Sequence, residues 1–178
     1  LEELVDLRKN GLGILYYGVE TGDDELRKKI TKGSDAKTCI EMGRKVIEAG
    51  IKLSVTVLLG IAGRAGSVKH AKATGELLRA MDPNFIGALT VMLIPGTPLY
   101  EDFVNKKFEL PDERELLMEL REMIRHTNLT RGLFYSNHAS NYLPVKARLP
   151  HGKQEALNLI DRALKGEVGL RPEWMRAL

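Results

Sequence analysis

The chain has 178 residues, and 27 Lys and Arg against 24 Asp and Glu give it a formal charge of +3. Apolar residues make up 43% and charged residues 29%, a composition that is typical of folded domains and excludes a disordered or fibrous protein. So small a net charge does not indicate nucleic acid as a partner. No apolar run reaches the roughly 20 residues of a membrane-spanning helix, so no membrane association is predicted.

Cysteine occurs once, as Cys39. A single thiol excludes an internal disulfide framework and favours a reducing, cytoplasmic location. It also excludes an iron–sulfur cluster held by this chain alone, because such clusters need several thiolates. The histidines show no metal-ligand spacing, so no metal site is predicted. Only His138 is kept as a candidate, and its SNHASN segment is otherwise explained as a cap on one end of the fold.

Three apolar runs predict parallel strands buried on both faces, at residues 14–20, 52–60 and 85–94. Helical patterns separate them, at residues 23–30, 35–49 and 67–81. The strand starts are about 35 residues apart, the length of one βα unit, and nothing indicates an antiparallel meander. We predict an α/β fold, which is either part of a barrel or a doubly wound sheet. A whole eight-stranded barrel needs about 250 residues.

Beyond residue 94 the pattern becomes mainly helical, with helices expected at residues 98–106, 112–128 and 152–165. The polar stretch 127–148 carries few helix signals, and Trp174 is expected to pack against the body of the domain. We therefore divide the chain into an α/β part, residues 1–110, and a helical C-terminal extension, residues 111–178. Because the chain starts at Leu1, inside a helix-like run, we interpret it as a piece of a longer protein.

All three strand tips carry glycine, in the segments GVETG (18–22), LLGIAG (58–63) and LIPGT (93–97). Ligands bind at the carboxyl ends of strands in α/β sheets and barrels, and glycine lets the backbone approach a ligand closely. One such glycine is explained by strand termination, whereas three together favour a shared ligand site. Glu20 can accept hydrogen bonds from ribose hydroxyls or an ammonium group, or act as an anion at the N-terminus of the following helix. Lys32 can bind an anionic ligand group or stabilise a helix C-terminus.

The ordered motifs GVETG, LLGIAG and PGTPLY resemble the C-terminal half of radical S-adenosylmethionine (radical SAM) enzymes. The most similar branch comprises the Fe–S oxidoreductases related to coproporphyrinogen dehydrogenases and methylthiotransferases. The resemblance covers about residues 11–100. It implies a partial TIM-type (β/α) barrel, with the three strands as barrel strands four to six, and a helical extension packed on it.

The resemblance also implies an enzyme that cleaves S-adenosylmethionine reductively at a [4Fe–4S] cluster, to start radical chemistry on a substrate that the sequence does not identify. The CxxxCxxC motif that binds the cluster is absent from these residues. The cluster is therefore expected only in the full-length protein, and the isolated chain is expected to be inactive. The implied partners are an electron donor and a small-molecule or macromolecular substrate.

Carried over residue by residue, the resemblance implies that Glu20 contacts the methionine or ribose part of the cofactor. Lys32 stands where the family has an arginine that pairs with the methionine carboxylate, and lysine lacks the bidentate fork. Thr56 stands where some members have a ribose-binding aspartate. The implied cofactor-binding set is Glu20, Thr21, Gly22, Lys32, Thr56, Gly60, Ile61, Gly63, Ile94, Pro95 and Gly96; no catalytic residue is assigned.

Two other functions fit the same residues. Half of a different βα-barrel enzyme could bind a phosphate-bearing ligand near Gly60 or Gly96, with Arg64 as the obvious cation. A non-catalytic α/β interaction module would use the glycines only to shape turns. The open edges of a partial barrel also favour self-association of the fragment.

Overall fold

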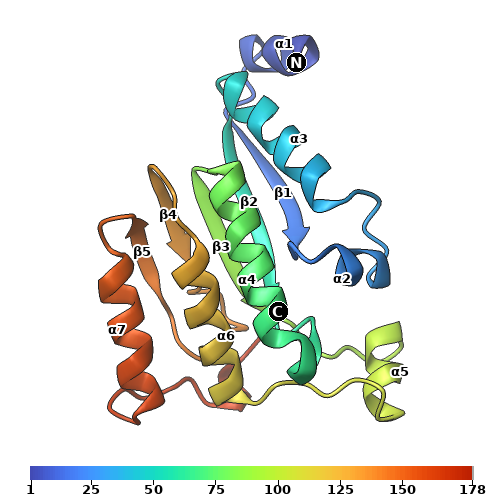
Figure 1. The fold of residues 1–178 in the computed structure, drawn as a ribbon, viewed down its shortest axis with the longest axis vertical. Coiled ribbons are helices and arrows are strands. Elements are labelled where there is room, and N and C mark those ends of the chain that lie inside the picture. Colours follow the sequence, from blue (N-terminus) through green and yellow to red (C-terminus); the bar gives the residue numbers. More distant parts are fainter. Residues whose placement is uncertain (178) are drawn as a thin grey trace.

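The computed structural model describes residues 1–177 and shows one five-stranded sheet with the strand order β1-β2-β3-β4-β5 (Figure 1). The strands are β1 (Ile14–Glu20), β2 (Lys52–Leu59), β3 (Phe85–Thr90), β4 (Gly132–Tyr135) and β5 (Lys146–Leu149). The first four run parallel, and β5 is antiparallel to β4.

Four helices lie on one side of the sheet: α3 (Ala36–Glu48), α4 (Gly63–Met81), α6 (Glu113–His126) and α7 (Lys153–Leu164). The shorter elements lie around its ends: α1 (Glu2–Lys9), α2 (Asp24–Lys29), α5 (Pro98–Val104) and the 3-10 turn η1 (Glu173–Met175). Within residues 1–177, no helix is both long and apolar enough to cross a bilayer.

The predicted α/β class and the three parallel strands are confirmed, and β1 begins and ends at the predicted residues, whereas β3 ends at Thr90, four residues before its predicted end. β2 stops one residue early because Gly60 turns the chain at φ +82°. Two helices begin at side-chain caps, since Asp35 accepts a hydrogen bond from Thr38 N and Asp112 forms a capping box with Glu115.

The C-terminal part holds two features that the sequence did not indicate. Strands β4 and β5 lie in and just beyond the polar stretch 127–148, which was noted only for its few helix signals, and they form an antiparallel pair. Each has only four residues, too few for alternation to stand out from a loop. The expectation that Trp174 packs against the body is wrong, since this residue is 82% exposed. Residues 111–177 share one sheet and one core with the first 110 residues.

The two faces of the sheet differ sharply in their surroundings. On β2, the side chains of Leu53, Val55, Val57 and Leu59 are buried against the helices, whereas those between them are only half-buried. No helix among residues 1–177 covers that second face, which we call the open face. At the free edge of the sheet, Tyr16 on β1 is 74% exposed. The open face and the strand tips are therefore where a ligand can approach.

Candidate functional site

Glu20 and Lys32 meet above the end of β1. Glu20 has a left-handed backbone, φ +66°, where the register of β1 against β2 shifts. Lys32 Nζ donates to the Gly18 carbonyl oxygen at 2.9 Å and to Glu20 Oε1 at 3.3 Å. A Cβ on residue 18 would lie 2.6 Å from Glu20 Oε1, so only glycine leaves room for this arrangement. The structure thus brings two predicted cofactor residues, twelve positions apart, into one ion pair.

Arg27 holds this pair in place and was not singled out by the sequence. Its buried guanidinium donates through Nη1 to the carbonyl oxygens of Val19 and Thr21, both at 2.9 Å, and through Nε to that of Ser34 at 2.7 Å. These bonds join the tip of β1 to the loop that carries Lys32. An arginine in a short charged helix gives no signal of such a role, because nothing local distinguishes it from a surface residue.

Thr56 lies on the open face between two glycines. It pairs in register with Gly18 on β1 and with Gly87 on β3. A Cβ at Gly87 would meet only Leu89 Cδ1, at 3.8 Å, so the space above that residue is open. Along the row Gly18–Thr56–Gly87, the open face therefore carries only one side chain, the short and polar Thr56. Glycine inside the apolar third strand was the available signal for this feature.

Ile61 lines a cavity of about 310 Å³ beside the strand tips. Its other walls come from the end of α2 and the turn after it, and from the start of α5: Lys29, Ile30, Thr31, Thr97, Pro98, Leu99 and Asp102. The predicted residues Ile94, Pro95 and Gly96 form the exposed turn that leads into α5. The cavity therefore joins segments that follow all three parallel strands, as the shared position of their tips predicts.

The other four predicted residues face away from the open face. Gly60 N donates to Glu119 Oε1 at 2.7 Å, and a Cβ on Gly63 would lie 3.1 Å from Phe108 Cε2. The Thr21 side chain is buried and bonds to His70 Nδ1 at 2.8 Å. Gly22 packs against α4. The structure gives all four a role in joining the strand tips to the helices.

Gly22 carries a direct test of this packing role. A Cβ there would lie 2.3 Å from the carbonyl oxygen of Ala73, so Gly22→Ala forces backbone apart. We expect it to lower the free energy of unfolding by about 2–3 kcal/mol in urea titrations. The matched control is Gly33→Ala, whose Cβ would meet no atom within 4 Å. Equal stability of the two variants would contradict the packing role.

A buried polar cluster lies behind the tips of β1 and β2. His70 Nε2 donates to the Leu58 carbonyl oxygen at 3.0 Å, so Nδ1 accepts from the Thr21 hydroxyl. Burial lowers the pKa of His70 to about 4, which keeps the ring neutral at neutral pH. Burial raises the pKa of the nearby Glu119 carboxyl to about 7. Both side chains are fully enclosed.

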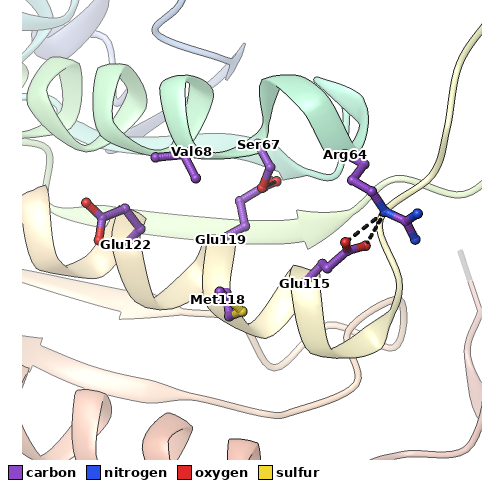
Figure 2. A pocket seen from close by; sticks show the side chains of 7 residues that line it. All are labelled: Arg64, Ser67, Val68, Glu115, Met118, Glu119 and Glu122. Atoms are coloured by element: carbon purple, nitrogen blue, oxygen red, sulfur yellow. Dashed lines mark hydrogen bonds and ion pairs between the residues drawn. The ribbon is translucent and has the colours of Figure 1, made fainter.

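Glu119 links the two longest helices. Figure 2 shows it reaching from α6 toward Ser67 on α4, and the Ser67 hydroxyl bonds to Oε2. The acidic residue sits within the apolar stripe of α6 that includes Leu116 and Met123. A carboxylate inside an apolar stripe is the signal in the sequence that indicates this buried role.

Arg64 lies among three carboxylates. Its guanidinium is paired with Glu109 and, at 2.7 Å, with Glu115, and Asp112 lies 4.0 Å away (Figure 2). These carboxylates raise the pKa of Arg64 and neutralise its charge. The one cation that the phosphate-binding alternative relied on near Gly60 is therefore already partnered.

Residues 1–177 do not supply a set of ligands for an iron–sulfur cluster. Among residues 1–177, no three His, Cys, Asp or Glu side chains are grouped so as to hold a metal ion. Cys39 is buried in α3, with its Sγ 3.1 Å from the Tyr17 hydroxyl and 3.3 Å from Ser34 Oγ. Any cluster used with this site needs ligands from outside these residues.

No protein-family model matches the chain. It is 22% identical over 172 residues to the heme chaperone HemW of Bacillus subtilis (strain 168), a match that covers 94% of this chain and 45% of HemW. Its fold is similar to that of Elp3 from the archaeon Methanocaldococcus infernus, solved with an N-terminal deletion, with a TM-score of 0.60 and 18% identity. That match covers 94% of this chain and 40% of Elp3.

Both relatives are radical SAM proteins. The predicted resemblance to the C-terminal half of a radical SAM enzyme is confirmed. The chain spans less than half the length of either relative, and the likeness to Elp3 shows the fold of a partial barrel.

Proposed function

We propose that this chain is the C-terminal half of a radical SAM enzyme and binds S-adenosylmethionine on its open face. The Glu20–Lys32 ion pair above Gly18 is the observation that carries the proposal. The two side chains are 18% and 33% exposed, so a ligand can reach both charges. One acid and one base side by side complement the zwitterionic amino-acid group of the cofactor.

The residues of the open face fit the cofactor. Lys32 would bind the methionine carboxylate, and Glu20 would accept from the ammonium group or a ribose hydroxyl. The Thr56 hydroxyl can bond to the ribose, and the glycines beside it allow the ligand to lie close to the backbone. The mainly apolar cavity around Ile61 suits the adenine ring.

The cofactor would supply the reactive radical, and the chain would supply placement. Glu20 and Lys32 would fix one end of the ligand, because each would exchange its present partner for a ligand group that carries the same charge as that partner. The sheet behind them is held by Arg27 and by the buried His70–Glu119 cluster, so both charges start from fixed positions. The cluster ligands would come from residues outside this chain, and the electron donor and the substrate would be separate molecules. We also propose that the protein works in the reducing cytoplasm.

The decisive experiment begins with the reading frame that encodes the residues before Leu1. We expect it to continue for roughly 150–250 codons and to encode CxxxCxxC. The whole protein, reconstituted anaerobically with iron and sulfide and then reduced, is expected to convert S-adenosylmethionine to 5′-deoxyadenosine. An upstream region without that motif, or a reconstituted protein that binds a sugar phosphate but not S-adenosylmethionine, would overturn the proposal.

A further inference from the structure

The C-terminal segment Arg171–Arg176, which we call the strap, clamps the loop Ser136–Asn141. In Figure 1 the red C-terminal segment runs from α7 across the lower end of the sheet. Arg171 Nη1 donates to the carbonyl oxygens of His138, Ala139 and Asn141, at 2.9, 2.8 and 2.9 Å. One guanidinium thus binds three carbonyl groups of the loop. Hydrogen bonds from a charged donor are stronger than those between neutral groups.

Arg176 closes the strap from the other side. Its Nε donates to the Ser140 carbonyl oxygen at 2.8 Å, and its guanidinium stacks 4.1 Å from the centre of the Tyr142 ring. The Arg176 side chain is only 4% exposed. Glu173 accepts from both the Tyr142 hydroxyl and Arg176, so the segment is tied together by polar bonds.

The clamped loop takes the place of a strand beside the end of β3. The neighbouring strand β4 pairs only with Phe85–Gly87. Beyond that point Ser140 Oγ accepts from Thr90 N at 3.1 Å, and Asn141 Oδ1 accepts from the Thr90 hydroxyl at 2.8 Å. Asn141 Nδ2 also donates to the Ala88 carbonyl oxygen at 2.8 Å. Side chains of the loop therefore satisfy the backbone that β4 leaves without a partner.

The strap is built for position rather than for burial of apolar surface. Its two largest apolar side chains, Trp174 and Met175, are 82% and 52% exposed, while its Arg176 is buried. A fully bonded polar network of this kind fixes geometry. Thr90, at the other end of this network, is the residue from which the chain leaves β3 toward Ile94–Gly96, three residues of the implied cofactor-binding set.

We propose that the strap positions the ligand-binding end of β3, with Arg171 and Arg176 as positioning residues that act through Ser140 and Asn141. The inference rests on the proposed function, because it needs a ligand at the strand tips. Loosening the strap then moves Thr90 and the turn after it, and the site loses affinity although no residue that touches the ligand has changed.

The test uses the reconstituted full-length protein and S-adenosylhomocysteine as the probe, with affinity measured by calorimetry. Arg171→Gln and Arg176→Gln are expected to weaken binding about fivefold or more. Amide exchange should rise in residues 88–97 and 136–141 and stay unchanged in α3. The matched control is Arg162→Gln on α7, where the arginine is 59% exposed and pairs with Glu167. We expect it to bind and exchange as the wild type does.

A second variant separates positioning from loss of the fold. Arg171→Lys keeps the charge but cannot span three carbonyl groups in the same way, and it is expected to keep the wild-type melting temperature while binding the probe more weakly. Wild-type affinity in Arg171→Lys and Arg176→Gln would overturn the inference alone. A wild-type protein that does not bind the probe would overturn the proposed function, and the strap's role with it.

Discussion

Glu20→Gln in the full-length protein is expected to weaken S-adenosylmethionine binding by about tenfold to a hundredfold. The variant keeps the size of the side chain and removes its charge, so an ammonium or ribose donor loses a charged acceptor. Hydrogen bonds to charged groups contribute roughly 1.5–3 kcal/mol, which corresponds to this range of affinity. Equilibrium dialysis with labelled cofactor measures the effect. The 5′-deoxyadenosine formed at saturating cofactor should change less than the affinity does.

Glu41→Gln is the matched control, because Glu41 is exposed on α3 and away from the strand tips. Lys32→Gln should weaken binding in the same direction as Glu20→Gln. Because the two side chains touch each other, the double variant should lose less than the sum of the single losses. Unchanged affinity in Glu20→Gln would remove the observation that carries the proposed function.

The βα units were predictable because each repeats a long, unambiguous pattern. β1 to β3 are apolar runs, and α3 carries a cap at Asp35 and an apolar stripe through Cys39 and Val46. β4 and β5 were not predictable. Their side chains alternate over only four residues. β4 pairs with β3, which lies more than 40 positions away, and β5 pairs in turn with β4.

The candidate site was predictable only in part. Glycine and charge at the tips of parallel strands indicate one edge of the sheet as the candidate site, but not which side chains lie on the open face. Thr21 and Gly22 follow directly on Glu20, yet they contact α4, because the backbone changes direction at the left-handed Glu20. The contact between Glu20 and Lys32 depends on Arg27, whose carbonyl partners come together only in the folded chain.

The buried cluster predicts two opposite pH dependences of stability. The pKa of Glu119 is raised from 4.5 to about 7, so its contribution is fully present below pH 4.5 and is lost as the pH rises through about 7. The pKa of His70 is lowered from 6.5 to about 4, so its contribution is present above pH 6.5 and is lost as the pH falls through about 4. Between these limits the two slopes oppose each other.

In Glu119→Gln, only the pH dependence of the free energy of unfolding that comes from His70 should remain. The amide can still accept from Gly60 N and donate to the Ser67 hydroxyl, so the variant keeps the bonds and loses the ionisation. Relative to the wild type, we expect its free energy of unfolding to improve by roughly 2–3 kcal/mol between about pH 5 and pH 8. Urea titrations of the apoprotein across this range measure the difference. A difference that stays constant with pH would mean that Glu119 is ionised in the folded protein throughout. The link between α4 and α6 would then be a buried charge held by Gly60 N and Ser67, rather than a carboxyl group kept neutral by its burial.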